Sequence, residues 1–268
     1  MLVRRQPAVR GVVALACSVL STIAWAQGTA ESQKPFEPTV AQAGKDVIWV
    51  PTPQITVDTM LALAKVTPAD YVIDLGSGDG VTVITAAKKG ATALGVEFNP
   101  DMVGLAKRRA QAAGVAAKAS FVQGDLFEAD LSKATVITLF LLPDINRRLR
   151  PKLLDLAPGT RIVSNTFEMG DWEPDAKARS EPCTTWCEAL LCIIPAKVAG
   201  TWQLASDPLV LAQRYQIVEG TLAGVPISGG RLTGADLTFT ANGRAYTAKV
   251  AGDTMTGDGW TAKRTAAP

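Results

Sequence analysis

The run Asp74-Leu75-Gly76-Ser77-Gly78-Asp79-Gly80 has the residue types and spacing best suited to binding a ligand. It follows an apolar run that predicts a strand and precedes a pattern that predicts a helix. Glycines at such a junction let the backbone approach a ligand at the carboxyl end of a sheet. The 268-residue sequence has no histidine, which excludes Ser-His-Asp hydrolysis, Cys-His proteolysis and His-ligated metals. We expect no metal site and assign no catalytic residue.

The charges in this loop indicate which cofactor it binds. A dinucleotide fingerprint, G-x-G-x-x-G, would place its third glycine at Val81, and no Gly-Lys-Ser/Thr follows as in a phosphate-binding loop. The carboxylates of Asp74 and Asp79 would oppose a pyrophosphate at close range but attract an ammonium or a sulfonium. S-adenosylmethionine (SAM) carries both cations, so we predict SAM as the cofactor. An NAD-type oxidoreductase is the alternative that nicotinamide-dependent fluorescence quenching would support.

Two further acids follow the next two predicted strands. Glu97 lies roughly 20 residues after Asp74, where an acid accepts hydrogen bonds from ribose hydroxyls in nucleotide sites. Asp125 is placed to accept a hydrogen bond from the adenine amino group. Each acid alone is as well explained as a cap or a solvated loop residue. Three acids at successive strand ends, together with the glycine loop, favour a shared site.

The surrounding sequence predicts the elements that position these residues. Its length gives one to two domains of about 150 residues each, and 47% apolar against 19% charged residues excludes a disordered chain. Strands are predicted at 70–75, 93–98, 121–122, 134–141 and 161–164, and helices at 57–66, 81–89, 101–113 and 145–156. Strands alternating with helices predict an α/β fold with a mostly parallel, doubly wound sheet. Residues 189–194 suggest one more strand.

Residues 196–268 have a different character, with short alternating runs interrupted by glycines. Asn242-Gly243 predicts a type I′ hairpin turn that pairs Ala241 with Arg244, Phe239 with Tyr246, and Leu237 with Ala248. We therefore predict a small C-terminal antiparallel β domain, with Trp202 and Trp260 in its core.

The N-terminus has the pattern of an export signal. Arg4, Arg5 and Arg10 precede an apolar run of about 14 residues, short of the ~20 that span a bilayer. Ala24-Trp25-Ala26 then provides a small-x-small cleavage site. We predict a signal peptide over 1–26, a linker over 27–45 and a periplasmic location without a stable membrane span. The alternative is an uncleaved segment that anchors the chain in the inner membrane.

Cleavage would leave three cysteines in an oxidising compartment. Cys183 and Cys187 are close enough in sequence to pair on a turn. Cys192 lies in an extended run that would carry it ~16 Å from Cys187, beyond bonding range. Three buried thiols are an equally good interpretation.

Several motifs resemble those of a known family. The glycine loop with Glu97 and Asp125 is similar to the class I SAM-dependent methyltransferase pattern. Val50-Pro51-Thr52-Pro53, Phe140-Leu141-Leu142-Pro143 and Asp171-Trp172-Glu173-Pro174 resemble motifs of one small family. It includes the mitochondrial protein-lysine methyltransferases that act on the ATP synthase c subunit and on the adenine nucleotide translocase. The resemblance covers residues 46–195 and implies a Rossmann-like methyltransferase domain. With the charge argument, it implies a cofactor site of Thr52, Asp74, Gly76, Ser77, Gly78, Gly80, Glu97, Phe98, Asp125 and Leu126.

The acceptor implied by the resemblance is a lysine side chain of a protein. Enzymes that methylate planar nitrogens often carry Asn/Asp-Pro-Pro-aromatic after the fourth strand, whereas this chain has Leu139-Phe140-Leu141-Leu142-Pro143. An apolar pocket lowers a lysine pKa by desolvation, so no dedicated base is needed. A net charge of +2 gives no reason to expect a nucleic-acid partner. We expect an acceptor pocket of Trp49, Phe140, Leu142, Asn165, Asp171 and Trp172.

A second hypothesis is an inactive methyltransferase fold that binds a partner in the cell envelope. The export signal motivates it, because SAM is made in the cytoplasm. The C-terminal β domain and the export signal both depart from the mitochondrial family members. A reporter that is active only after export, fused to residues 1–40, would show whether the chain leaves the cytoplasm, where SAM is made.

Overall fold

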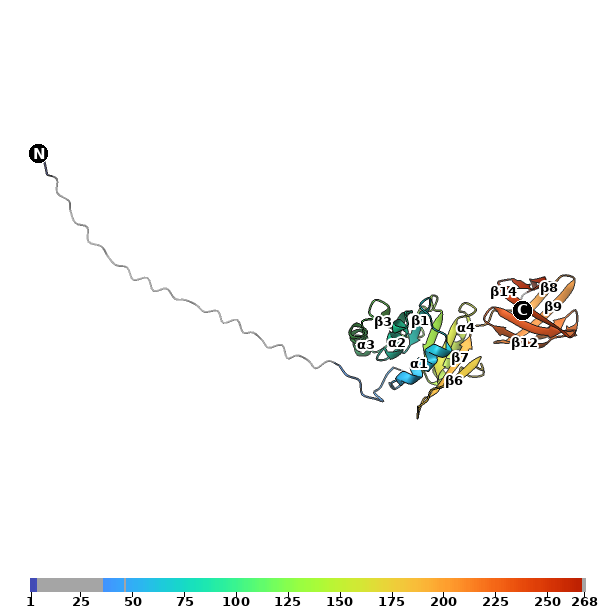
Figure 1. Cartoon of the computed structure of the whole chain (residues 1–268), viewed down its shortest axis with the longest axis horizontal. Coiled ribbons are helices and arrows are strands. Elements are labelled where there is room, and N and C mark those ends of the chain that lie inside the picture. The colour runs from blue at the N-terminus through green and yellow to red at the C-terminus, as the bar shows by residue number, and fades with distance from the viewer. Residues whose placement is uncertain (4–35, 46, 267–268) are drawn as a thin grey trace. The chain divides into compact units, whose positions relative to one another are not determined.

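The computed structural model describes residues 1–3, 36–45 and 47–266. The predicted signal peptide, apart from its first three residues, and the predicted linker up to residue 35 lie outside the described residues. The chain divides into Met1–Pro35 and one compact unit, Phe36–Pro268, which contains two sheets. Figure 1 shows the helices of the described residues lying with the first sheet.

The first sheet is mixed. Its elements are α1 (Gln54–Leu63), β1 (Tyr71–Leu75), α2 (Val81–Lys88), β2 (Thr92–Glu97), α3 (Pro100–Ala112), β3 (Ala119–Gln123), β4 (Val136–Leu139), α4 (Pro143–Leu154), β5 (Arg161–Asn165), β6 (Ala176–Arg179) and β7 (Glu188–Ile193). The strand order is β3-β2-β1-β4-β5-β7-β6. Strands β1 to β5 pair in parallel, and β7 runs antiparallel to both β5 and β6.

Apolar side chains on both faces of the sheet explain why helices cover both faces. Successive strand residues point to opposite faces, and Val72 and Ile73 accordingly belong to two different hydrophobic clusters. The first cluster includes residues of α1, α2 and α3, and the second includes residues of α4. All four residues of β4 are buried, as expected for a strand covered on both faces. The doubly wound arrangement predicted from the sequence is confirmed.

The order of the strands places a crevice above β1. This strand pairs with β2 on one side and with β4 on the other, so the chain reverses direction across the sheet there. Ligands of open α/β sheets bind at such a switch point, outside the carboxyl ends of the strands. The segments after β1, β2, β3 and β4 therefore form the edge where a site is expected.

The second sheet is a closed antiparallel barrel. Its strands are β8 (Gly200–Leu204), β9 (Asp207–Arg214), β10 (Ile217–Leu222), β11 (Val225–Pro226), β12 (Ser228–Thr233), β13 (Asp236–Ala241), β14 (Arg244–Ala251), β15 (Thr254–Gly257) and β16 (Trp260–Ala266). A pairing between β9 and β10 closes the ring, and the short β11 is attached to β10. The predicted antiparallel β domain is therefore present.

The predicted hairpin of the barrel is confirmed residue by residue. Strands β13 and β14 pair Ala241 with Arg244, Phe239 with Tyr246, and Leu237 with Ala248. Asn242 and Gly243 both have positive φ, 51° and 74°, as a type I′ turn requires. Trp202 is fully buried in the barrel core, whereas Trp260 is only partly buried against it.

Among the described residues, Cys183 and Cys187 form a disulfide, while Cys192 is a buried thiol. Burial raises the pKa of Cys192 to about 12, which favours its protonated form at neutral pH. Among the residues that the structure describes, no helix is long and apolar enough to cross a bilayer.

Candidate cofactor site

The glycine loop between β1 and α2 forms a tight bend. Gly76, Gly78 and Gly80 have φ values of 76°, 52° and 84°, a region that glycine enters without steric cost. The amides of Gly76 and Ser77 donate to the carbonyl of Val96 at 2.8 and 3.1 Å. These bonds join the start of the bend to β2 and leave Gly78 to be held by a side chain.

Glu97, at the end of β2, holds the middle of the bend. Its Oε2 accepts a hydrogen bond from the Gly78 amide at 2.9 Å, and its Oε1 accepts one from the Asn99 amide at 2.8 Å. A carboxylate oxygen has a second lone pair, so each oxygen can still accept from a ligand. The geometry therefore leaves Glu97 available to both hydroxyls of a ribose.

Asp74 is a buried carboxyl beneath the bend. Thr138 Oγ1 of β4 donates to its Oδ1 at 2.5 Å. Burial, together with the negative charges of Glu97 and Asp79, raises the pKa of Asp74 to about 7 against the opposing effect of the Thr138 hydrogen bond. The negative charges of Glu97 and Asp79 disfavour ionisation of Asp74, and a cation bound beside Asp74 would relieve that repulsion.

Asp125, in the segment after β3, is held at the opposite end of the site. Lys45 Nζ donates to its Oδ2 at 2.5 Å, and the Phe127 amide donates to its Oδ1 at 2.9 Å. Both bonds lower the pKa of Asp125, and the bond from Lys45 has the larger effect. Lys45 also lies 5.1 Å from the centre of the Phe98 ring.

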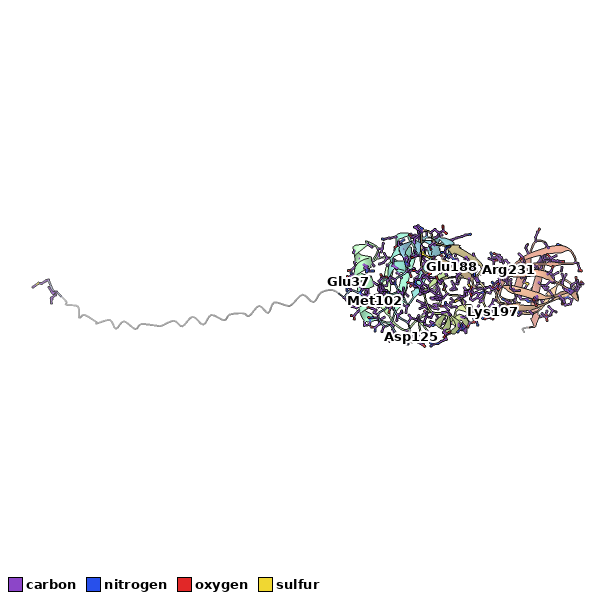
Figure 2. All side chains as sticks on the ribbon, turned by 90° about the horizontal axis from the view of Figure 1, so that it is seen from below. Glu37, Met102, Asp125, Glu188, Lys197 and Arg231 are labelled. Carbon is purple, nitrogen blue, oxygen red and sulfur yellow. A yellow bond between two sulfur atoms is a disulfide. The ribbon has the colours of Figure 1, made fainter. Side chains whose placement is uncertain are left out.

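A pocket of about 1050 Å³, open solvent at its mouth included, lies over these residues. The predicted site residues that line it are Trp49, Thr52, Asp74, Gly76, Ser77, Gly78, Glu97, Phe98, Asp125, Leu126 and Phe140. Met102 and Asp125, two lining residues from α3 and from the segment after β3, are labelled in Figure 2.

The pocket has features that fit SAM. A Cβ atom added to Gly78 would lie 2.7 Å from Trp49 Nε1, so only glycine lets Trp49 pack this close to the bend. The acids lie at the bend, and Phe140, Leu139 and Met102 supply apolar walls. Glu97 would hold the ribose, Asp125 the adenine amino group, and Asp74 the cationic end.

A segment before α1 also lines the pocket, and the sequence interpretation missed part of it. The lining includes residues 42–45, which fall within the predicted linker, as well as residues 47–52. The Trp49 amide donates to the Gln42 carbonyl at 3.0 Å, and the Ala41 amide donates to the Trp49 carbonyl at 2.9 Å. These bonds fold the segment back on itself and place Trp49 against Gly78. The apolar run Val47-Ile48-Trp49-Val50 was the available signal.

Comparison with known proteins identifies the family. The family model of the ANTKMT methyltransferase domain matches residues 74–176. A protein-lysine N-methyltransferase of Saccharolobus islandicus (strain REY15A) is 48% identical over 131 residues, which are 48% of this chain and 81% of that protein. The chain belongs to this methyltransferase family. The resemblance inferred from the sequence is confirmed, and the protein is a SAM-dependent methyltransferase. The alternative of an inactive binding module finds no support.

One solved structure agrees on the fold and the cofactor, and a further sequence relative is also named a methyltransferase. A crystal structure of an RNA methyltransferase from Salinibacter ruber, in complex with S-adenosyl-L-homocysteine, is 48% identical, with a TM-score of 0.53, over 56% of this chain and 96% of that chain. The mouse adenine nucleotide translocase lysine N-methyltransferase is 38% identical over 122 residues, 45% of this chain and 53% of that protein. The chain spans about half the length of this mouse relative.

Gly80 lies outside the pocket of this methyltransferase, contrary to prediction. It precedes α2, and a Cβ atom there would lie 2.8 Å from the Phe121 ring and 2.9 Å from Ala106 Cβ. The glycine is therefore required for packing α2 against its neighbours rather than for contact with the cofactor.

Leu142 and Asn165 are also placed away from the pocket. Leu142 is the N-cap residue just before α4 and is 47% exposed, while Leu141 and Ile145 line the pocket instead. Asn165 is fully buried at the end of β5, and its Oδ1 accepts a hydrogen bond from Thr166 Oγ1 at 2.9 Å. The start of the helix turns Leu142 outward. Asn165 is buried at the end of β5 and does not line the pocket.

Asp171 and Trp172 join the methyltransferase sheet to the barrel instead of forming an acceptor pocket. Trp172 is fully buried, and its Nε1 donates to Gln216 Oε1 at 2.8 Å. Asp171 accepts hydrogen bonds from Arg150 at 2.5 Å, Arg214 at 2.8 Å and Tyr215 at 3.0 Å. These contacts hold the pKa of Asp171 well below its usual range, with Arg214 as the main cause.

A second ion pair crosses the same junction. Arg231, labelled in Figure 2, donates to the largely buried Asp175 at 2.6 Å. The motif Asp171-Trp172-Glu173-Pro174 is thus a structural joint, which the sequence interpretation had mistaken for part of the acceptor site.

Proposed function

We propose that this protein transfers the methyl group of SAM to the ε-amino group of a lysine in an acceptor protein. The observation that carries the proposal is the 48% identity, over 81% of its length, to an enzyme named protein-lysine N-methyltransferase. The apolar edge of the pocket, where Leu139 ends β4 and Phe140 follows it, suits an aliphatic side chain.

The residues of the pocket would divide the work. When bound, SAM supplies a methyl group activated by its sulfonium charge. Glu97 and Asp125 would fix the two ends of its nucleoside, and Asp74 would favour its positive charge. Phe140 and Trp49 would exclude water from the acceptor. A lysine must lose its proton before it attacks, and an apolar surrounding lowers its pKa without a dedicated base.

A nucleobase acceptor is the second candidate, because the Salinibacter ruber relative is described as an RNA methyltransferase. Two observations weigh against it. The segment after β4, Leu139-Phe140-Leu141-Leu142-Pro143, lacks a side-chain amide to bind a planar nitrogen. The net charge of +2 provides little attraction for a phosphate backbone.

The two candidates are separated by one assay. The full chain is incubated with methyl-labelled SAM and either a bacterial envelope-protein extract or total RNA, and the products are hydrolysed to amino acids or nucleosides. We expect label in methyllysine and none in nucleosides. Label in nucleosides alone would contradict the lysine acceptor. The Glu97→Ala variant controls for transfer by a contaminating enzyme.

We also propose that the chain is exported to the periplasm. The disulfide between Cys183 and Cys187 supports this, since disulfides persist in oxidising compartments. The basic and apolar pattern of the N-terminus, outside the described residues, agrees with it. A reporter that is active only after export, fused to residues 1–40, should be active. A reporter that stays in the cytoplasm would contradict the proposal.

A further inference from the structure

An aromatic cluster extends from the cofactor pocket toward the surface. It consists of Phe140, which lines the pocket, and Phe167 and Trp186, which do not. The ring centres are 6.0 Å apart for Phe140 and Phe167, 5.7 Å for Phe140 and Trp186, and 5.4 Å for Phe167 and Trp186. Each ring therefore touches the other two, and we name this set the aromatic trio.

The topology explains why the trio sits beside the site. Phe140 follows β4 and Phe167 follows β5, so both lie at the carboxyl edge of parallel strands. Trp186 precedes β7, which runs antiparallel to β5 and therefore starts at the same edge. The edge that carries the cofactor site thus also carries the trio.

Trp186 exposes much of its ring. It is 39% exposed, and Phe140 and Phe167 are half-buried beneath it. A tryptophan that packed only to stabilise the fold would bury more of its surface. The trio therefore offers aromatic surface to a ligand at a point continuous with the methyl-donor pocket.

The position of Trp186 is held by an unusual backbone. Its φ of 56° lies in the left-handed region, which is costly for a bulky residue and persists only where the surroundings enforce it. The disulfide between Cys183 and Cys187 closes a short loop around it. The Trp186 carbonyl also accepts a hydrogen bond from Thr56 Oγ1 of α1 at 3.3 Å, and Thr56 is fully buried.

Aromatic faces suit one class of acceptor. They attract an arriving ammonium group placed within about 6 Å of a ring centre, before the lysine loses its proton deeper in the apolar pocket. The methylene chain of a lysine packs on the same rings, as amphipathic side chains do on apolar surfaces. We propose that the aromatic trio binds the acceptor lysine side chain at the mouth of the methyl-donor pocket, and that the Cys183–Cys187 disulfide holds Trp186 in place for it. This proposal rests on the lysine-methyltransferase function proposed above.

Variants of the full chain test the assignment through the acceptor KM. Trp186→Ala and Phe167→Ala should raise the KM for the envelope-protein extract about 5- to 30-fold, while the Kd for S-adenosylhomocysteine stays within about twofold. Trp186→Phe keeps an aromatic face and should retain most of the affinity. The double variant Cys183→Ser, Cys187→Ser should raise the same KM without weakening the binding of S-adenosylhomocysteine.

A matched control lies in the barrel, where Phe239, Tyr246 and Trp260 form a second set of touching rings. Tyr246→Ala removes a ring from that set and should leave the acceptor KM unchanged. An equal rise for Tyr246→Ala and Trp186→Ala would mean that the effect is one of stability, and would overturn the proposal. An unchanged KM in Trp186→Ala would overturn it as well.

A binding experiment separates this inference from the proposed function. The protein is labelled with 5-fluorotryptophan, Trp186 is assigned from the spectrum of Trp186→Phe, and N-acetyl-lysine methyl ester is titrated in the presence of S-adenosylhomocysteine. A shift of the Trp186 resonance supports the site even if no methyllysine forms in the assay, a result that would count against the proposed function alone. A resonance that does not move overturns the site.

Discussion

The amide of Gly78 donates a hydrogen bond to Glu97 Oε2 at 2.9 Å, and this bond ties the glycine bend to the end of β2. The other oxygen of Glu97 accepts from the Asn99 amide at the start of α3. One carboxylate therefore sets the shape of the bend and also lines the pocket. If Glu97 binds the ribose as proposed, loop geometry and cofactor recognition depend on the same side chain.

Replacing Glu97 by alanine should weaken SAM binding by about 1–3 kcal/mol, or about 5- to 150-fold in Kd, the scale for losing a charged acceptor. Glu97→Gln keeps an acceptor oxygen but loses the charge, so its SAM affinity should lie between those of wild type and Glu97→Ala. Calorimetric titration with SAM measures both. If Glu97→Ala binds SAM as tightly as wild type, the assignment of Glu97 to the ribose is wrong.

Gly78→Ala should abolish or strongly weaken SAM binding, because the new Cβ would lie 2.7 Å from Trp49 Nε1 and displace that ring. The control is Gly114→Ala, at a glycine with a similar positive φ of 71° but open space around it. Both variants suffer similar backbone strain. Equal SAM affinity in the two variants would contradict the claim that the contact with Trp49 makes glycine necessary at position 78.

Ionisation of Asp74 should make SAM binding depend on pH. Burial raises the pKa of this carboxyl from 3.8 to about 7 in the folded chain. Between these values the folded state holds a proton that the unfolded chain has released, so the free energy of unfolding of the cofactor-free protein should fall as pH rises. A cationic cofactor prefers the ionised carboxylate, so its affinity should rise over the same range, by up to about tenfold per pH unit.

The variant Asp74→Asn provides the test, because it cannot ionise. Its SAM affinity should be weak and nearly constant between about pH 5 and 7, while that of the wild type rises; calorimetry at several pH values compares them. Parallel curves for the two proteins would assign the pH dependence to another group.

Trp172→Phe should lower the free energy of unfolding by about 1–3 kcal/mol without changing SAM affinity. The variant leaves the buried Oε1 of Gln216 without the donor that now lies 2.8 Å away. Thermal or denaturant unfolding gives the stability, and calorimetry gives the affinity. A selective rise in acceptor KM with unchanged stability would return Trp172 to the acceptor site.

Local signals in the sequence were sufficient to predict the sheet and the cofactor loop. The alternation of apolar strands with helices, the glycines of the bend and the Asn242-Gly243 turn are each determined by neighbouring residues. The short edge strand β6, Ala176–Arg179, has no comparable pattern, since its residues are only partly buried or exposed.

The misplaced residues depend on partners that are distant in sequence. Asp171 and Trp172 have the sequence context of loop residues near a strand end. In the structure Arg150 binds Asp171, and Trp172 donates to Gln216 of the barrel, so both residues connect the sheet to the barrel. Trp186 was overlooked for the same reason, because it approaches Phe140 only after the sheet is assembled. Periodicity and spacing cannot show such contacts.

The most direct test of the account is a calorimetric titration of the purified chain with SAM, with S-adenosylhomocysteine and with NAD. The acidic glycine bend should bind the first two with one site per chain and should not bind NAD, and Glu97→Ala should bind SAM more weakly. Failure to bind SAM, or binding that Glu97→Ala leaves intact, would contradict the claim that this bend is a methyl-donor site.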